Sequence, residues 1–252
     1  MCGIVGYTGG QPAQEIVLES LKKLEYRGYD SSGIATHEGK LVICKKEGLI
    51  ENMEAELSES KSTLAIAHTR WATHGVPSDV NAHPHSDEKV SVAVVHNGTI
   101  DNYLEIKEYL EAEGHNFKSD SDSEILPLLI SKYYSGNLVE AVNKMLNDIR
   151  GIFTIAAIHK DNPDEIVAVR NETPLVVGLG NSENFVSSDI YAILKYTQEI
   201  VYPEDYQIVR VTSDKVEVLD RDLNLLDYNV ETVEKYTEVA EKGGFEHFML
   251  KE

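Results

Sequence analysis

Short apolar runs recur along the chain and are separated by polar turn residues. Runs of this length, bounded by glycine, proline, asparagine or aspartate, are typical of β-strands. His37-Glu38-Gly39-Lys40 lies between two of these runs and predicts a hairpin turn. We therefore expect strands at residues 4–7, 33–37, 41–45, 64–68, 90–96, 151–159, 166–170, 175–178 and 207–212.

Apolar residues recur at helical spacing in four other segments. Val17, Leu21 and Leu24 form one such series, and Tyr103, Ile106 and Leu110 form another that ends at Gly114. Two further helices are expected at 122–134 and 138–149.

Pairs of strands interrupted by pairs of helices predict an α+β fold of antiparallel sheets with helices packed outside. A parallel, doubly wound sheet is disfavoured because strands and helices do not alternate strictly. Gly178-Leu179-Gly180 lacks the third glycine and the following helix of a dinucleotide-binding turn.

Composition narrows the class of partner. The 252 residues carry a formal net charge of −20 at pH 7, which argues against nucleic acid or an anionic membrane as partner. Such a surface suits a small zwitterionic or anionic substrate held by a few buried arginines. Two cysteines give no disulfide framework, and the sequence contains neither a leader pattern nor a membrane-spanning apolar run. We expect a cytoplasmic protein.

Cys2 is the first candidate for chemistry. Removal of the initiator Met1, which is usual before a small side chain, would leave a thiol and a free α-amine on the same residue. An α-amine has a pKa of about 7.7–8.0, so it can act as base for its own thiol. The alternative is a small buried hydrophobe at the start of a strand. Cys44, in Leu41-Val42-Ile43-Cys44-Lys45, is interpreted as strand packing.

A dense polar run follows the expected strand at 64–68. His68-Thr69-Arg70-Trp71-Ala72-Thr73-His74-Gly75 contains two histidines, an arginine and the only tryptophan of the chain. Loops carry binding residues disproportionately, so this run is a candidate site. The alternative is a strand end whose polar side chains face solvent.

The histidines near this run could form a metal site. His83-Pro84-His85 could chelate an ion together with His68, His74 or His96. The segment lacks a Cys-x-x-Cys pair and a His-x-x-x-His helix, so a structural metal is disfavoured and no cofactor is expected.

Asn97-Gly98 lies between apolar runs and could form a hairpin turn. Because a helical pattern follows Asp101, we expect instead a turn that joins a strand to a helix. There the Asn97 amide and the Gly98 backbone N–H would supply the two donors of an oxyanion hole. In Ser119-Asp120-Ser121-Asp122-Ser123-Glu124 most side chains are interpreted as helix caps, but one carboxylate could bind a substrate ammonium.

Several of these motifs together resemble a known family. They are similar to the glutaminase domain of glutamine–fructose-6-phosphate aminotransferases, which are class II, or N-terminal-nucleophile, glutamine amidotransferases. The resemblance covers residues 1–252 as one domain and implies a four-layer α/β/β/α sandwich. Relatives that aminate phosphoribosyl pyrophosphate share the Cys-Gly start and the Asn-Gly pair but not the Arg-Trp-Ala-Thr-His-Gly run. The motifs are Cys2-Gly3-Ile4-Val5-Gly6, Leu24-Glu25-Tyr26-Arg27-Gly28-Tyr29-Asp30-Ser31, the run from His68 to Gly75, Asn81-Ala82-His83-Pro84-His85, His96-Asn97-Gly98, Gly178-Leu179-Gly180 and His247-Phe248-Met249-Leu250-Lys251-Glu252.

The resemblance implies roles for the catalytic residues. Cys2 would be the nucleophile and its own α-amine the base, with Asn97 and the Gly98 N–H as the oxyanion hole. Arg27 would support the N-terminal strand and the site.

The resemblance also implies how L-glutamine is held. Arg70 would bind the α-carboxylate and Asp122 the α-ammonium. Thr73 and His74 would lie on a loop that closes over the substrate, and Trp71 would gate the passage of ammonia.

We expect no counterpart of this family's sugar-phosphate isomerase domain within residues 1–252. The chain by itself is therefore expected to hydrolyse glutamine, and the full-length enzyme is expected to be a homodimer. Two other classes remain open, a catalytically silent glutamine-binding module and an N-terminal-nucleophile hydrolase of another amide. Release of glutamate and ammonia would exclude the first, and selectivity among amides would exclude the second.

Overall fold

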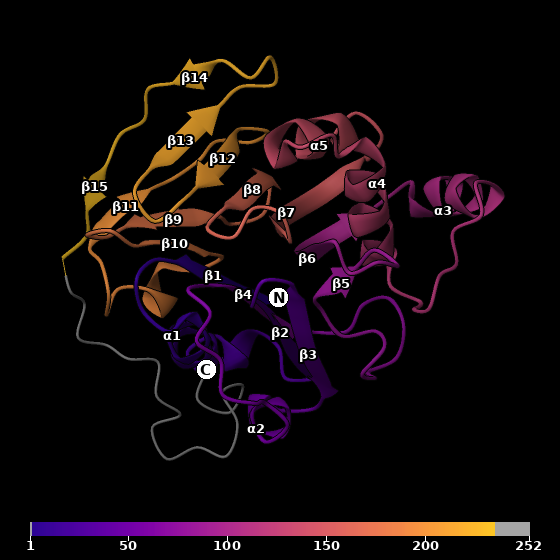
Figure 1. The fold of residues 1–252 in the computed structure, drawn as a ribbon, viewed down its shortest axis with the longest axis horizontal. Helices are drawn as coiled ribbons and strands as arrows, with labels where there is room; N and C mark the ends of the chain where they lie inside the picture. Colours follow the sequence, from indigo (N-terminus) through magenta and orange to yellow (C-terminus); the bar gives the residue numbers. More distant parts are fainter. Residues whose placement is uncertain (1, 235–252) are drawn as a thin grey trace.

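Two antiparallel sheets lie face to face in the computed structural model, which describes residues 2–234 (Figure 1). The first has eight strands, in the order β15 (Glu231–Thr232), β11 (Glu199–Val201), β9 (Val176–Leu179), β10 (Asn184–Ser187), β1 (Gly3–Thr8), β4 (Leu64–Arg70), β2 (Ser31–His37) and β3 (Leu41–Glu47). The second has seven, in the order β14 (Leu225–Leu226), β13 (Val216–Leu219), β12 (Ile208–Val211), β8 (Ile166–Asn171), β7 (Gly151–His159), β6 (Val92–Ile100) and β5 (His85–Ser86).

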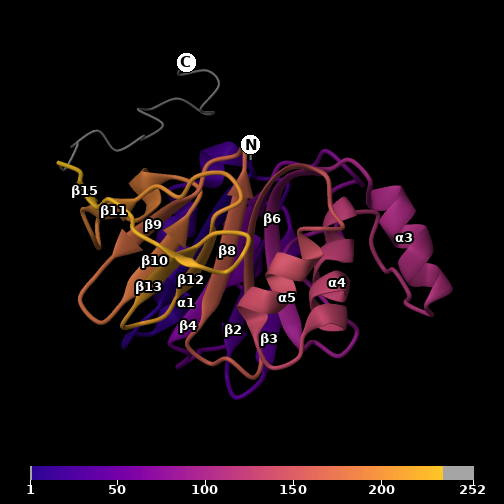
Figure 2. The same cartoon turned by 90° about the horizontal axis from the view of Figure 1, so that it is seen from above.

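Helices cover the outer face of each sheet. α1 (Ala13–Lys22) and α2 (Ile50–Glu54) pack on the eight-stranded sheet, and α4 (Ile125–Tyr133) and α5 (Leu138–Met145) pack on the seven-stranded one. α3 (Tyr103–Ala112) contacts α4 and lies at the periphery (Figure 2). Within residues 2–234 there are also three single turns of 3₁₀ helix: η1 (Glu25–Arg27), η2 (Asp122–Glu124) and η3 (Ile190–Ala192). The expected four-layer α/β/β/α sandwich is confirmed.

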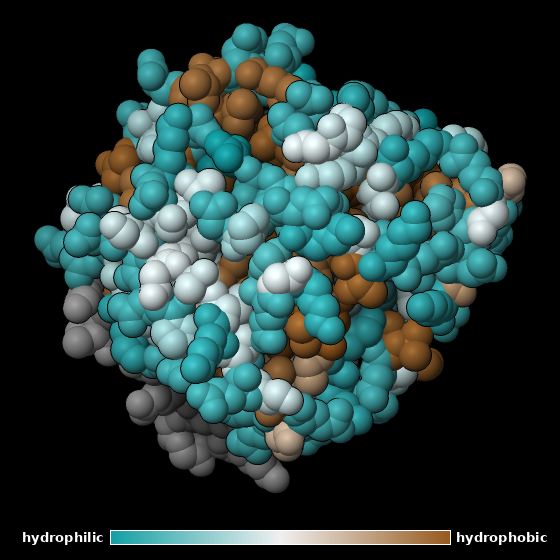
Figure 3. Space-filling view, viewed as in Figure 1, coloured by the Kyte–Doolittle hydropathy of each residue, from teal (hydrophilic) through white to brown (hydrophobic). Residues whose placement is uncertain are grey.

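The central strands are buried on both faces, which explains why they appear in the sequence as continuous apolar runs. On β4, Leu64 and Ile66 face the interior between the sheets, whereas Ala65 and Ala67 face the layer that contains α1. Each strand thus contributes to two apolar cores at once. The view in Figure 3 shows a mainly hydrophilic surface with small separate apolar patches, as the acidic composition leads one to expect.

Most elements lie where the sequence pattern places them. All nine expected strands are present, and so is the hairpin between β2 and β3. The helix expected at 122–134 is divided into η2 and α4, and the one expected at 138–149 ends at Met145. The pattern missed α2 and the short strands β5, β10, β11, β13, β14 and β15, because they are too short to show a period.

The expected turn at Asn97-Gly98 is wrong. Both residues lie within β6, paired with Thr154 and Phe153 of β7. Gly98 has a φ of 119°, and a Cβ there would lie 2.0 Å from the Ile152 carbonyl oxygen. Glycine is therefore required by the close approach of the neighbouring strand, and a turn prediction from local sequence alone cannot detect such a tertiary contact.

The motif at 247–252 lies outside the described residues. Within residues 2–234, the helices are all too short to cross a membrane.

Candidate active site

The candidate site lies at one end of the two sheets, where β1 begins and β4 ends. Antiparallel pairing sets Gly3 opposite Thr69, which brings the residue before β1 next to the residues that follow β4. The Trp71 backbone N–H accordingly lies 3.2 Å from the Cys2 Sγ, to which it donates a hydrogen bond. Main-chain register therefore places the thiol beside the polar run that begins at His68.

The thiol of Cys2 is only partly exposed, and burial raises its pKa. The hydrogen bond from the Trp71 N–H and the charge of Arg70 act in the opposite direction but do not cancel the effect of burial. The thiol is therefore protonated near neutral pH, and its use as a nucleophile requires a base.

Asn97, on β6, is held by hydrogen bonds to Cys2 and to His68 of the eight-stranded sheet. Its Nδ2 donates to the Cys2 carbonyl oxygen at 3.1 Å, and its Oδ1 lies 3.1 Å from the Nε2 of His68. The bond to His68 fixes which end of the amide faces Cys2. One N–H of the Asn97 amide is not used by Cys2, and it remains available to a ligand.

Arg70 is the last residue of β4 and is 4% exposed. Its Nη2 donates to the carbonyl oxygens of His74 and Gly75, so the guanidinium holds the loop that follows the strand. Its Nη1 is buried and has no hydrogen-bond partner within the part of the chain that the structure describes. A buried, unpaired guanidinium N–H is costly unless a ligand accepts from it.

Asp122 supplies the negative charge of the site. It lies on η2, is 5% exposed, and its Oδ2 accepts from the Ile100 backbone N–H at 2.9 Å. The pocket between Arg70 and Asp122 has an empty volume of about 270 Å³, including its open mouth. It is lined by Cys2, Arg70, Trp71, Thr73, His74, His83, His96, Gly98, Ser121, Asp122 and Ser123.

Four buried histidines cluster at this pocket, and two of them, His83 and His96, line it. The ring of His83 lies 4.2 Å from that of His68, 4.6 Å from His85 and 6.4 Å from His96, between centroids. Burial lowers the pKa of all four, to about 3 for His68. They are therefore neutral near pH 7. Within residues 2–234, there is no group of three or more histidine, cysteine or acidic side chains placed to hold a metal ion.

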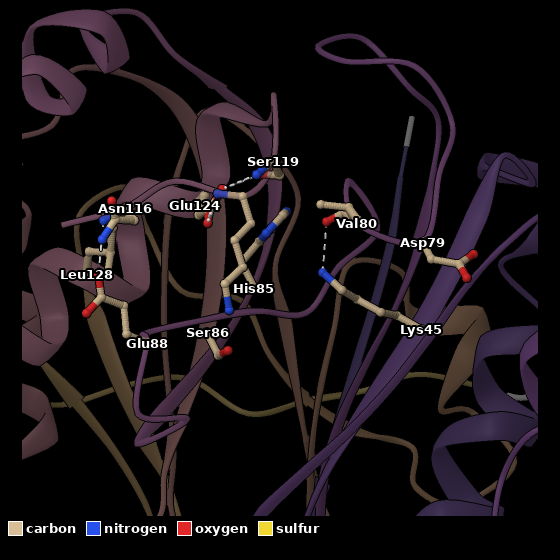
Figure 4. A pocket seen from close by; sticks show the side chains of 11 residues that line it. Lys45, Asp79, Val80, His85, Ser86, Glu88, Asn116, Ser119, Glu124 and Leu128 are labelled. Atoms are coloured by element: carbon tan, nitrogen blue, oxygen red, sulfur yellow. Dashed lines mark hydrogen bonds between the residues drawn. The ribbon is translucent and has the colours of Figure 1, made fainter. Parts of the chain in front are cut away.

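A second pocket, lined in part by His85, is shown in Figure 4. Its empty volume is about 810 Å³, including open solvent. The ammonium of Lys45, on β3, points into it and donates to the carbonyl oxygens of Val80 at 3.0 Å and Ala82 at 2.7 Å. Burial lowers the pKa of Lys45 to about 8. Lys45 thus connects the eight-stranded sheet to the segment that follows residues 71–76, the loop after Arg70 that is called the Arg70 loop below.

The structure brings together most of the residues selected from sequence. Seven of them line the same pocket: Cys2, Arg70, Trp71, Thr73, His74, Gly98 and Asp122. Asn97 contacts Cys2 directly. Sequence reasoning considered His83 and His96 only as metal ligands and interpreted Ser121 and Ser123 only as helix caps, so it missed all four as lining residues.

Arg27 is placed apart from the pocket lining. Its guanidinium forms an ion pair with Asp189, and its Nη1 lies 3.5 Å from the Ser188 carbonyl oxygen. The Oγ of Ser188 in turn accepts from the Ile4 backbone N–H at 3.0 Å. Arg27 therefore contacts β1 through Ser188 and not the pocket itself.

Comparison with known proteins indicates the same class of site as the geometry does. A family model described as a glutamine amidotransferase domain matches residues 68–195, about half of the chain. The chain is 50% identical to a glutamine–fructose-6-phosphate aminotransferase (isomerizing) of Fusobacterium nucleatum and 46% identical to one of Thermus thermophilus. Both alignments cover 100% of this chain but 42% of the relative, so the chain spans less than half the length of these curated relatives.

Solved structures with the same fold include a glutamine phosphoribosylpyrophosphate amidotransferase from B. subtilis, complexed with ADP and GMP. It matches with a TM-score of 0.76 at 26% identity, over 89% of this chain and 50% of that chain. A structure described as the allosteric regulatory enzyme of purine biosynthesis matches with a TM-score of 0.77, also at 26% identity, over 88% of this chain and 50% of that chain.

The fold is that of the N-terminal-nucleophile hydrolases. The chain belongs to the family of glutamine amidotransferase domains, as its motifs led us to expect.

Because these histidines are buried in their neutral form, we expect the free energy of unfolding to fall as the pH is lowered below about 6.5. An unfolded histidine has a pKa of about 6.5. Because the folded pKa values are lower, the unfolded chain binds more protons in this range. Each histidine then removes up to about 1.4 kcal/mol of stability per unit fall in pH. The free energy of unfolding, measured with urea at pH 7, 6 and 5, should fall less steeply with pH for His85→Gln than for the wild type.

His115→Gln is the matched control, since the side chain of His115 is 30% exposed. An equal pH dependence for the wild type and His85→Gln would show that His85 is not buried in its neutral form.

Proposed function

We propose that this chain hydrolyses L-glutamine to glutamate and ammonia, with Cys2 as nucleophile. One observation carries the proposal: a thiol, a buried guanidinium with an unpaired N–H and a buried carboxylate line one pocket. A positive and a negative group beside a nucleophile are what an α-amino acid with a reactive side chain requires. The family of the chain supports the same substrate.

The two charged groups would orient the substrate. The α-carboxylate of glutamine would accept from Arg70, in a charge-assisted pair that satisfies the unpaired Nη1. The α-ammonium would lie at Asp122, whose Oδ2 is already fixed by the Ile100 N–H. Thr73 and His74, on the loop held by Arg70, would complete the binding site. With both ends of the α-carbon held, the side-chain amide extends toward Cys2.

The base would be the α-amine of Cys2 once Met1 has been removed. Burial raises the pKa of the thiol, so proton transfer to an amine with a pKa of about 7.7–8.0 would generate the thiolate at the moment of attack. Arg27 would support this arrangement at a distance, through Ser188 and the start of β1.

The reaction proceeds by two acyl transfers. The sulfur attacks the amide carbon, and the developing oxyanion accepts from the Asn97 amide and the Gly98 N–H. The protonated α-amine of Cys2 gives its proton to the leaving nitrogen. The C–N bond then breaks, and ammonia departs from a γ-glutamyl thioester. Water then attacks the thioester carbon and gives a proton to the α-amine. Finally the C–S bond breaks, releasing glutamate and restoring the thiol.

The longer relatives support a second proposal, about the use of the ammonia. The curated relatives are named for fructose 6-phosphate, and this chain covers 42% of their length. We propose that in a full-length homodimeric enzyme of the cytoplasm a sugar-phosphate isomerase domain would receive the ammonia and make glucosamine 6-phosphate. Trp71 would gate its passage. The Trp71 ring lies at the pocket, 41% exposed, and contacts the Tyr29 ring edge-on at 5.7 Å.

Cys2→Ala is expected to abolish glutamine hydrolysis and to leave glutamine binding largely intact, because the charged contacts lie on Arg70 and Asp122. A glutamine-like electrophile such as 6-diazo-5-oxonorleucine should label Cys2 and spare Cys44. The Cys44 thiol lies on β3 and does not line the pocket, and burial raises its pKa. Intact-mass and peptide analysis would measure the labelling and the removal of Met1. Labelling of Cys44 alone, or of both equally, would contradict the assignment.

Arg70→Lys is expected to weaken glutamine binding strongly, since lysine lacks the planar fork that can hold a carboxylate and the loop carbonyls together. The expected increase in KM is about tenfold to a hundredfold, from the loss of one charge-assisted bond. Steady-state glutaminase kinetics would measure it. Arg210→Lys is the matched control, because Arg210, on β12, also binds carboxylates, those of Glu165 and Glu217, but away from the pocket. A near wild-type KM for Arg70→Lys would assign the α-carboxylate to another residue.

Residues 1–252 alone are expected to release glutamate and free ammonia at a rate that does not depend on fructose 6-phosphate. Coupling requires a ligand to interact differently with two states of the protein, and the acceptor site is proposed to lie on the second domain. Parallel assays of glutamate and glucosamine 6-phosphate, with and without the sugar phosphate, would test this. Activation by fructose 6-phosphate would show that an acceptor site lies within these residues.

A further inference from the structure

The two charged groups of the pocket lie on separate segments of the chain. Arg70 ends β4 and holds the loop at His74 and Gly75, whereas Asp122 lies on η2. An α-amino acid carries its carboxylate and ammonium on one carbon, so their separation is fixed. Recognition therefore depends on whatever sets the spacing between the Arg70 loop and the segment before η2.

The side chain of Asn81 connects these two segments. Its Nδ2 donates to the Val76 carbonyl oxygen at 2.9 Å, at the end of the Arg70 loop. Its Oδ1 accepts from the Asp120 backbone N–H at 2.9 Å, two residues before Asp122. Asn81 is 3% exposed, and a Cβ at Gly75 would lie 2.7 Å from its Nδ2. The amide is thus packed between both segments and uses its donor end on one and its acceptor end on the other.

The backbone around Asn81 is itself fixed to the sheet. The carbonyl oxygens of Val80 and Ala82, on either side of Asn81, both accept from the Lys45 ammonium of β3. Figure 4 shows the bond to Val80. The Ala82 N–H donates to the Ser78 carbonyl oxygen at 3.1 Å, which closes a turn at the same place. Asn81 is therefore attached to a rigid support and does not move freely with either loop.

We propose that Asn81 is a positioning residue that sets the distance between the α-carboxylate site at Arg70 and the α-ammonium site at Asp122. This inference rests on the proposed function, because it assigns the spacing to glutamine recognition. Asn81 does not line the pocket and need not touch the substrate. Its effect would fall on the affinity for the α-amino-acid group, since small displacements of a charged clamp are enough to weaken binding.

Asn81→Asp tests the inference with little change in size. The carboxylate can still accept from the Asp120 N–H, but it cannot donate to the Val76 carbonyl and repels it. We expect KM for glutamine to rise about tenfold to a hundredfold, as for the loss of a buried hydrogen bond, with kcat changed much less. Asn184→Asp is the matched control. Asn184 is 5% exposed, donates to the Thr212 carbonyl at 2.7 Å and accepts from the Gly180 N–H at 3.2 Å. It pairs with Thr8, at the opposite end of β1 from Cys2.

Two thiol reagents separate positioning from general damage. Iodoacetamide reaches Cys2 without an α-amino-acid group, whereas 6-diazo-5-oxonorleucine has one. In Asn81→Asp, inactivation by the second reagent should slow about tenfold or more while inactivation by iodoacetamide is unchanged. Asn81→Ser, whose hydroxyl is too short to span both segments, should behave in the same way and serves if Asn81→Asp does not fold.

The outcomes are distinguishable. A wild type that neither hydrolyses glutamine nor reacts with 6-diazo-5-oxonorleucine would contradict the proposed function itself. An active wild type together with a normal KM in both Asn81 variants would overturn the positioning role alone. Equal slowing by both reagents, with the same loss in Asn184→Asp, would also overturn it, because the effect would then be one of general stability.

Discussion

The imidazole of His68 joins the two sheets at the end where the pocket lies, and the placement of the Cys2 main chain depends on this contact. From β4 in one sheet, its Nε2 reaches the His96 carbonyl oxygen at 3.0 Å and the Asn97 Oδ1 at 3.1 Å on β6 in the other. Asn97 in turn donates a hydrogen bond to the Cys2 carbonyl oxygen, so the position of Asn97 also fixes the Cys2 main chain. Both partners are acceptors, so Nε2 carries the proton of the neutral ring and donates to them. Burial lowers the pKa of His68 to about 3, so the ring is neutral near pH 7.

The site divides its tasks between rigid and less regular parts of the chain. The groups proposed for the chemistry, Cys2, Asn97 and Gly98, lie on or beside strands of the two stacked sheets. The groups proposed for recognition lie at Arg70, on the loop after it and on η2. A strand fixes a reacting atom more firmly than a loop does, whereas a loop can close over a substrate. Arg70 belongs to both parts, because it ends a strand and holds the loop.

Electrostatics separates the surface from the pocket. The sequence has a net charge of −20, and few charged side chains of residues 2–234 are buried. The pocket wall, in contrast, includes the neutral rings of His83 and His96, which cluster with His68 and His85. Burial keeps these rings uncharged, so Arg70 and Asp122 supply the strongest charges at the pocket. A zwitterion would then be oriented by two groups of opposite sign, with little competing field from the wall. The same burial makes the fold sensitive to acid.

The sequence by itself determined the layers of the fold and most of the lining of the pocket. Long apolar runs identify buried strands, and the polar run from His68 to Gly75 is visible because it follows one of them directly. The tertiary structure decided what depends on contacts distant in sequence. Gly98 lies within a strand and not in a turn because the Ile152 carbonyl approaches it. Likewise, His83 and Asn81 acquire their places only when β4, β6 and η2 meet. Local pattern records the periodicity of one segment, whereas these positions are set by the packing of several segments against one another.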